Sequence, residues 1–201
     1  MSRFHSSLLL PLLLATPLLA NAASSHYRLD PVHTRVLFAI DHAGFSKALG
    51  TVSGSQGSLD FDPDDWRHAQ LQVTVPLNRL DLGDPDWNKA ALGRRLLDAA
   101  KFAEAHFVST RVEPLSKEHA RVFGDLTLHG TTHEIVLDVQ LNAVKRQPMP
   151  PFRRTVGFSA STTLQRSDFG IDAWSSMIGD QVHLQIEVEA ERDHHGNGDD
   201  T

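Results

Sequence analysis

The chain of 201 residues is predicted to fold as an all-β protein, in the form of an antiparallel sandwich or barrel. Three observations support this prediction. Several short segments alternate apolar and polar residues with a period of two, which is the pattern of a strand with one buried face. Turn-forming residues separate these segments. The regular alternation of strands and helices that is typical of parallel sheets does not occur in the sequence.

The N-terminal residues have the features of a secretory signal peptide. Arg3 supplies a positive charge, and the segment Leu8–Leu19 is apolar but too short to span a bilayer. The small residues Ala20-Asn21-Ala22 then fit the pattern of a cleavage site. We therefore expect cleavage after Ala22 and an exported mature protein that is not an integral membrane protein. A retained N-terminal anchor is the less favoured alternative.

Three strands are expected in the first part of the mature chain. Arg35–Asp41 is a mostly apolar run that is rich in β-forming residues. In Leu71–Leu77 apolar residues alternate with polar ones, and Pro76 indicates a strand end or an edge strand. A third, shorter run occupies Phe107–Val112.

The segment Arg121–Val139 is predicted to form a β-hairpin. Its two alternating runs meet at His129-Gly130-Thr131-Thr132. One face of the first run carries Val122, Leu126 and Leu128, and the opposite face carries Phe123, Asp125 and Thr127. Two later segments, Thr155–Leu164 and Val182–Glu191, alternate in the same way and are also expected to be strands.

One helical segment interrupts the strands. Asp84 can cap the N-terminus of a helix, and Pro85 suits its first position. The run from Trp87 to Ala100 is expected to be helical, although Gly93 weakens a helix by roughly 1 kcal/mol relative to alanine. A helix between strands of a barrel usually closes one end, and that is the expected place of this one.

The composition excludes several classes of protein. Cysteine is absent, which excludes thiol chemistry and zinc–cysteine sites. The formal charge is −6 and no dense Lys/Arg cluster occurs, so a nucleic acid is not an expected partner. The end of the chain has no apolar residue and is expected to be disordered. The expected layout is a signal peptide (residues 1–22), one barrel domain (residues 23–192) and a disordered tail (residues 193–201).

Six motifs in order along the mature chain resemble those of the YceI-like family. They are Asp30-Pro31-Val32-His33-Thr34, Gly50-Thr51-Val52-Ser53-Gly54, Leu59-Asp60-Phe61-Asp62, Gly124–Gly130 (GDLTLHG), Arg166–Ile171 (RSDFGI) and Gly179–Glu189 (GDQVHLQIEVE). The resemblance implies an antiparallel lipocalin-like β-barrel with a short helical segment closing one end. It also implies a periplasmic binding or carrier protein that encloses a polyisoprenoid, an isoprenoid quinone or a fatty-acid-type amphiphile. The alternative is an accessory docking module of a membrane redox system with a cytochrome b-type partner, or of a stress-response system.

Eight aromatic residues are candidates for the apolar lining of such a barrel: Phe38, Phe45, Phe102, Phe107, Phe123, Phe158, Phe169 and Trp174. A barrel of about eight strands can be filled by side chains or can hold one ligand. The residues alone leave both outcomes open, and the resemblance favours a ligand tunnel.

Seven residues are candidates for contact with a polar head group: His33, Arg35, His42, Trp87, Asn88, Arg94 and Arg95. Arginine can hold a phosphate through paired donors, and tryptophan or asparagine can position a quinone or phosphate oxygen. A solvated helix face is equally expected for the two adjacent arginines, and structural hydrogen bonds are expected for the two histidines.

No catalytic residue, cofactor or metal site is predicted. The sequence contains no glycine-flanked serine elbow, phosphate loop or cysteine nucleophile, and a small-ligand hydrolase or isomerase is the last-ranked alternative. His129 and His133 are four residues apart, but the turn between them excludes the helical zinc geometry. Arg166 is expected to fix the turn before the last strand. Exposed strand edges make a homodimer plausible.

Overall fold

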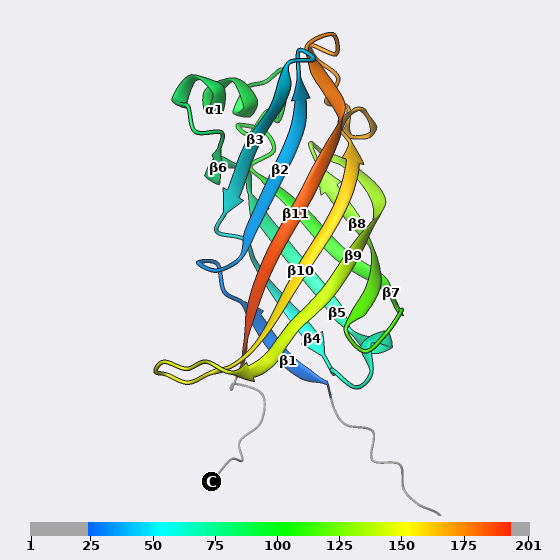
Figure 1. Ribbon diagram of the computed structural model, residues 1–201. Coiled ribbons are helices and arrows are strands. Elements are labelled where there is room, and N and C mark those ends of the chain that lie inside the picture. The colour runs from blue at the N-terminus through cyan, green and yellow to red at the C-terminus, as the bar shows by residue number, and fades with distance from the viewer. Residues whose placement is uncertain (1–23, 194–201) are drawn as a thin grey trace, which may run out of the picture.

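In the computed structural model, which describes residues 24–193, strands form most of the chain (Figure 1). The predicted signal peptide lies outside the described residues, as does the predicted tail beyond Asp193. The strands are β1 (Ser25–Leu29), β2 (Arg35–His42), β3 (Ser46–Ser53), β4 (Gln56–Phe61), β5 (Gln70–Pro76), β6 (Leu80–Asp81), β7 (Glu104–Pro114), β8 (His119–Leu128), β9 (Thr131–Arg146), β10 (Arg154–Gln165) and β11 (Ile178–Arg192).

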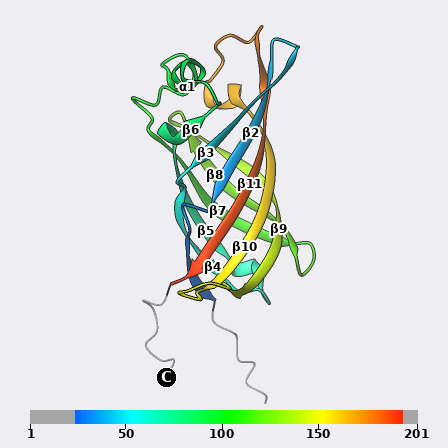
Figure 2. The same cartoon turned by 60° about the vertical axis from the view of Figure 1, so that its left-hand side comes forward.

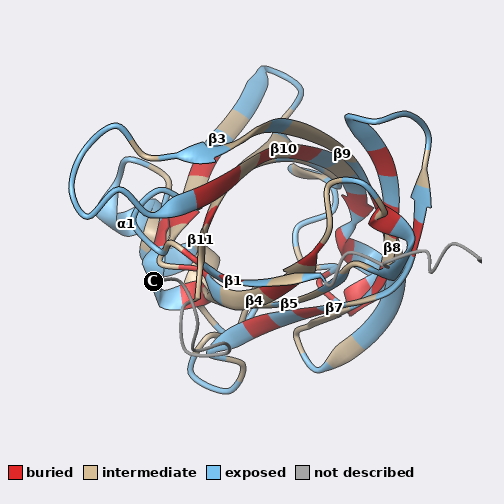
Figure 3. Ribbon diagram, turned by 90° about the horizontal axis from the view of Figure 1, so that it is seen from below, coloured by how far each residue is buried: buried red, intermediate tan, exposed pale blue. Residues whose placement is uncertain are grey.

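The strands close into an antiparallel barrel. Neighbouring strands pair in the order β1-β4-β5-β7-β8-β9-β10-β11, and β11 pairs back with β1, so that eight strands form a ring (Figure 3). β11 is long enough to pair with two strands, with β1 near its C-terminal end and with β2 along the rest of its length. From β2 the sheet continues to β3 and the short β6. The predicted all-β barrel is confirmed.

The β8–β9 hairpin forms as the alternating pattern predicts. Leu128 pairs with Thr131, which leaves His129 and Gly130 as a two-residue turn, with φ of 52° and 77°. Positive φ at both central residues matches the right-handed twist of the flanking strands. A Cβ at Gly130 would also lie 2.6 Å from the ring of Phe102, so only glycine fits there without displacing that ring.

The helix α1 (Pro85–Leu92) is shorter than the sequence predicts. Its start is as expected, because Asp84 accepts hydrogen bonds from the backbone amides of Asp86 and Trp87. The helix ends at Leu92, because its C-cap Gly93 is extended (φ −71°, ψ 163°), and the predicted continuation to Ala100 is wrong. Turns follow instead and direct Leu96 and Leu97 into the barrel. Their apolar side chains are removed from water there, which an exposed helix would not achieve.

The two ends of the barrel differ. α1 and the β10–β11 connection lie at one end, and the β4–β5, β7–β8 and β9–β10 connections lie at the other (Figures 1 and 2). At the second end the 3-10 helix η1 (Trp66–His68) brings the buried indole of Trp66 against Phe61 and Phe158, with ring centroids 5.1 and 5.9 Å away and edge-to-face geometry. These rings close this end of the barrel.

Across residues 24–193, none of the helices has the length and apolar character needed to cross a membrane.

Candidate ligand-binding site

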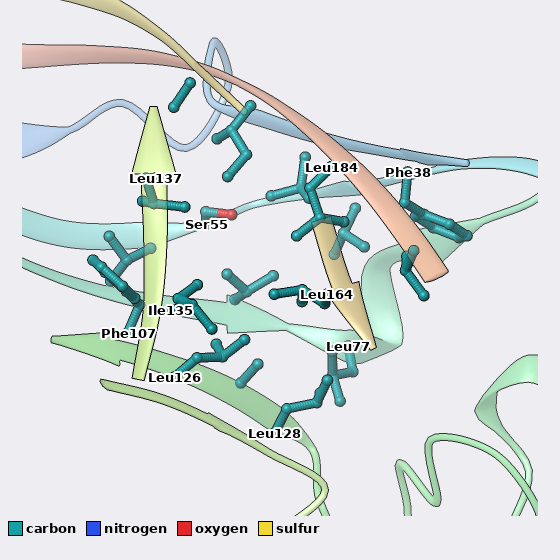
Figure 4. A pocket seen from close by; sticks show the side chains of 18 of the residues that line it. Phe38, Ser55, Leu77, Phe107, Leu126, Leu128, Ile135, Leu137, Leu164 and Leu184 are labelled. Carbon is teal, nitrogen blue, oxygen red and sulfur yellow. The ribbon is translucent and has the colours of Figure 1, made fainter. Parts of the chain in front are cut away.

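The barrel encloses a cavity of about 640 Å³ (Figure 4). This volume lies within the range of about 300–1,000 Å³ that is usual for ligand pockets. Nearly all of its wall is aliphatic or aromatic, and side chains of β2, β5, β7, β8, β9, β10 and β11 contribute to it. The barrel is therefore hollow, which decides between the two outcomes that the sequence left open.

Strand alternation explains why this wall is apolar. On β11 the side chains of Val182, Leu184, Ile186 and Val188 line the cavity, whereas the polar residues between them face outwards. On β8 the cavity is lined by Val122, Leu126 and Leu128. These are the faces that the period-two pattern marks as buried.

The cavity opens at the end of the barrel that carries α1. Five residues of its wall are exposed, and all five belong to this end: Asp41, Trp87, Ala90, Trp174 and Met177. The rings of His42 and Trp87 stack at a tilt, with centroids 5.1 Å apart, and the guanidinium of Arg95 lies 5.9 Å from the ring centroid of Trp174. We call this group of exposed lining residues the mouth.

Few polar groups reach the cavity wall, and most of them are already paired. The hydroxyl of Ser109 accepts a hydrogen bond from the amide of Leu71 at 2.8 Å, and that of Thr34 donates to the carbonyl of Glu189 at 3.4 Å. Ser55 differs, because its hydroxyl is buried and has no partner among the described residues. The indole Nε1 of Trp66 is the other buried side-chain atom in this part of the chain with no partner.

The guanidinium of Arg166 is buried at the edge of the cavity but is committed to the backbone. It donates to the carbonyl oxygens of Gly179, Ile171 and Ile178 at 2.8, 2.6 and 2.9 Å. These bonds fix the β10–β11 connection, in agreement with the structural role that the sequence indicates. Three of the five N–H groups of Arg166 are therefore committed to the backbone.

Five of the eight predicted lining aromatics lie on the cavity wall: Phe38, Phe107, Phe158, Phe169 and Trp174. Their contact with a ligand stays a prediction. The expectation for the other three is corrected. Phe45 is 92% exposed at the tip of the β2–β3 hairpin, Phe102 packs against His129, and Phe123 lies on the outer face under the guanidinium of Arg111, at 3.6 Å.

Two of the seven predicted head-group residues line the cavity: Trp87 belongs to the mouth, and His42 lies against its ring. The structure places the other five outside the cavity wall. Arg35 and Arg94 are exposed, and Arg95 approaches the mouth only through Trp174. The side chain of Asn88 is hydrogen-bonded to the loop before α1, where it accepts from the amide of Leu82 and donates to Asp81.

His33 belongs to a surface cluster outside the cavity. Its Nδ1 lies 2.6 Å from Asp30, whose carboxylate also accepts from the amides of Val32 and His33, and Glu189 lies nearby. The hydrogen bond that His33 donates to Asp30, and then the negative charges of Asp30 and Glu189, raise the pKa of His33. Burial raises the pKa of Asp30, but its hydrogen bonds outweigh this and lower the pKa overall. The carboxylate of Asp30 thus stabilises the turn after β1 by accepting these hydrogen bonds.

Aliphatic residues form most of the wall, and the predicted lining set, which contains aromatic residues alone, does not include them. Leu96 and Leu97 are examples, since the sequence places them in a predicted helix and not on the cavity wall. Ser55 carries no signal of its own in the sequence, since a serine after a glycine is typical of any turn.

Comparison with known proteins gives a family match. The model of the YceI-like domain matches residues 27–190. A UPF0312 protein of Pseudomonas syringae pv. syringae is 35% identical over 164 residues, covering 80% of this chain and 84% of that protein. A UPF0312 protein of Vibrio cholerae serotype O1 is 29% identical over 174 residues, covering 86% and 91%.

Solved structures share the fold. BcnA of Burkholderia cenocepacia superposes with a TM-score of 0.71 at 22% identity, covering 80% of this chain and 98% of that one. The YCEI protein of Campylobacter jejuni gives 0.68 at 24% identity, covering 75% and 88%. A polyisoprenoid binding domain from Saccharophagus degradans gives 0.62 at 15% identity, covering 85% and 99%. At these identities the likeness establishes the barrel fold.

Proposed function

The chain belongs to the YceI-like domain family, and from this premise we propose that it is a binding or carrier protein for one long apolar ligand. The ligand class is a polyisoprenoid, an isoprenoid quinone or a fatty-acid-type amphiphile. We further propose that the protein acts in the periplasm after cleavage behind Ala22. N-terminal sequencing of the protein from a periplasmic extract tests this location, and the expected first residue is Ala23.

The observation that carries the proposal is the hollow, apolar interior with one mouth. Each methylene that leaves water contributes roughly 0.8 kcal/mol, so one five-carbon isoprene unit contributes up to about 4 kcal/mol. A few units therefore supply ample affinity even after the ordering costs of binding are subtracted. The same wall discriminates poorly between apolar chains, so chain length and polar groups must provide selectivity.

A charged head group has to stay at the mouth in this arrangement. Burial of an unpaired charge is costly, and the buried guanidinium of Arg166 is already used by three carbonyl groups. Trp87 and Trp174 at the mouth can contact the first part of an entering chain. The polyisoprenoid binding domain from Saccharophagus degradans, which has the same fold, supports the choice of ligand class.

The cavity also favours a carrier over a docking module for a membrane cytochrome. A module that acts only through its outer surface gains nothing from a hollow core, whereas filling the core would stabilise it. An interior left open through most of the length of the barrel is a cost that ligand binding offsets. Binding without covalent chemistry is sufficient to explain this architecture.

Intrinsic fluorescence tests the proposal, because all three tryptophans of the chain line the cavity. Titration of delipidated protein with geranylgeraniol should change the emission saturably, with one ligand bound per chain. Absence of any saturable change with geranylgeraniol, with a long-chain quinone and with a long-chain fatty acid would overturn the proposed function.

A further inference from the structure

We propose that Ser55 is an internal polar anchor, and that the preferred ligand carries an uncharged oxygen which enters the barrel and hydrogen-bonds to the Ser55 hydroxyl. This inference rests on the proposed function and specifies the chemistry of its ligand. The oxygen belongs to a hydroxyl, carbonyl, amide or quinone group. A phosphate or carboxylate head is outside this class.

The first observation is the state of the hydroxyl itself. Ser55 is 1% exposed, and no group of residues 24–193 pairs with its Oγ. Figure 4 shows this oxygen pointing into the space enclosed by the lining side chains. A buried hydroxyl without a partner costs about 1–3 kcal/mol, so the free protein retains a group that destabilises it. A hydrogen bond from a bound ligand removes that cost.

The second observation concerns the other polar groups on the wall. The hydroxyls of Ser109 and Thr34 are bonded to backbone groups, so the unpaired state of Ser55 is not a general feature of hydroxyls in this barrel. The one other unpaired buried side-chain atom within the described chain, Nε1 of Trp66, also belongs to a lining residue. Both unpaired groups thus belong to residues that line the cavity.

The position of Ser55 requires the oxygen to lie well inside. β3 starts next to the hairpin at the mouth and ends at Ser53, two residues before Ser55. At about 3.3 Å per residue, the seven steps from Ser46 to Ser53 cover about 23 Å, and Ser55 lies two residues further along the chain. The polar group of the ligand therefore enters the barrel instead of remaining at the mouth.

The surroundings decide which kind of oxygen fits. Arg166 is the one lysine or arginine among the described lining residues, and three of its donors are held by backbone carbonyl groups, while Asp41 at the mouth disfavours an anion. A trapped water molecule needs about two to four polar partners, which this nearly all-apolar wall does not provide. A neutral oxygen on an otherwise apolar chain satisfies the hydroxyl and keeps the remaining contacts apolar.

The test compares two saturated ligands that differ only by a hydroxyl group, phytanol and phytane, in binding to delipidated wild-type protein and to Ser55→Ala. We expect Ser55→Ala to weaken phytanol binding about 5- to 20-fold and to leave phytane binding within twofold. Phytanyl phosphate, whose charge keeps its head at the mouth, should also change by less than twofold. The empty Ser55→Ala protein should melt at the same temperature as wild type or higher.

Ser109→Ala is the matched control, because it also removes a hydroxyl from the wall, but one that holds the amide of Leu71. It should lower the melting temperature and weaken phytanol and phytane equally. Three results in Ser55→Ala would each overturn the anchor. They are an equal loss of affinity for phytanol and phytane, an unchanged affinity for phytanol, and a loss of affinity for phytanyl phosphate as large as that for phytanol. If wild type binds none of the three ligands, the proposed function itself fails.

Discussion

Gly50 of β3 lies directly opposite Phe38 of β2, and the ring of Phe38 occupies the space that a side chain at residue 50 would fill. A Cβ there would lie 2.7 Å from Cε1 of Phe38 and closer still to Cζ. Phe38 lines the cavity, so the missing side chain of Gly50 allows its ring to lie along the wall. The ring of Phe107 on β7 likewise occupies the space that a side chain at Gly124 of β8 would fill, although Gly124 itself pairs with Ser109.

Gly50→Ala should therefore reduce ligand affinity more than it reduces stability. The ring of Phe38 can rotate away from a new methyl group, but only by moving into the cavity, so we expect a loss of roughly tenfold in geranylgeraniol affinity. Fluorescence titration measures the affinity and urea denaturation the stability. Gly57→Ala is the contrasting variant, because a Cβ there would clash with the backbone carbonyl of Gln72. This substitution should mainly lower the stability of the protein. Unchanged affinity in Gly50→Ala would contradict the role of this pair.

Filling the cavity from one wall should abolish binding without unfolding the barrel. Ala160 of β10 faces the cavity, and its neighbour Ser161 faces outwards. We expect Ala160→Phe to lower geranylgeraniol affinity by more than tenfold, because the new ring takes the place of the chain. Ser161→Phe adds the same ring outside and should bind like wild type. Equal binding by the two variants would show that the ligand lies elsewhere.

Arg166→Met should destabilise the protein strongly. The substitution keeps much of the side-chain volume but leaves three carbonyl groups without their donor, and each buried polar group left unpaired costs about 1–3 kcal/mol. We expect a loss of at least about 3 kcal/mol in the free energy of unfolding, measured by urea denaturation. Arg154→Met, at an exposed position of β10, is the control and should change little.

The Asp30–His33 pair should produce a pH dependence that is independent of the ligand. The pKa of His33 is raised above its ordinary 6.5, so its stabilising contribution is present below that pH and is lost as the pH rises through the higher folded-state pKa. The pKa of Asp30 is lowered below 3.8, so its contribution is lost as the pH falls through the lower folded-state value.

Melting curves from pH 5 to 9 check this dependence. Part of the fall in melting temperature above about pH 6.5 should disappear in His33→Gln and in Asp30→Asn, while ligand affinity stays that of wild type. A steeper fall in the melting temperature of either variant above pH 6.5 would contradict a stabilising Asp30–His33 pair.

Strand periodicity predicted the β8–β9 hairpin and which side chains of β11 face inwards, because one buried face imposes a period of two. The same rule places Phe123 outside, opposite Val122, and should have excluded it from the lining. The predicted helix is longer than α1 because Leu96 and Leu97 continue the helical spacing from Leu92 in the sequence. In the structure these two side chains pack into the cavity beyond Gly93.

Other features lie beyond the sequence pattern. An apolar inward face is the same whether a barrel is filled or hollow, since the difference depends on how far the opposite walls stand apart. Whether a buried hydroxyl has a hydrogen-bond partner likewise depends on the tertiary structure and not on the sequence pattern. The sequence around Ser109 and Ser55 does not show which hydroxyl is paired, because the pairing of Ser109 depends on the approach of the Leu71 amide from another strand.

Native mass spectrometry of protein purified from its own cells tests the central claim most directly. The wild-type chain should retain one long apolar molecule, released by organic solvent, and Ala160→Phe purified in parallel should be free of it. A wild-type chain that is empty under conditions that preserve non-covalent complexes, or an equal load on both proteins, would contradict a ligand-carrying barrel.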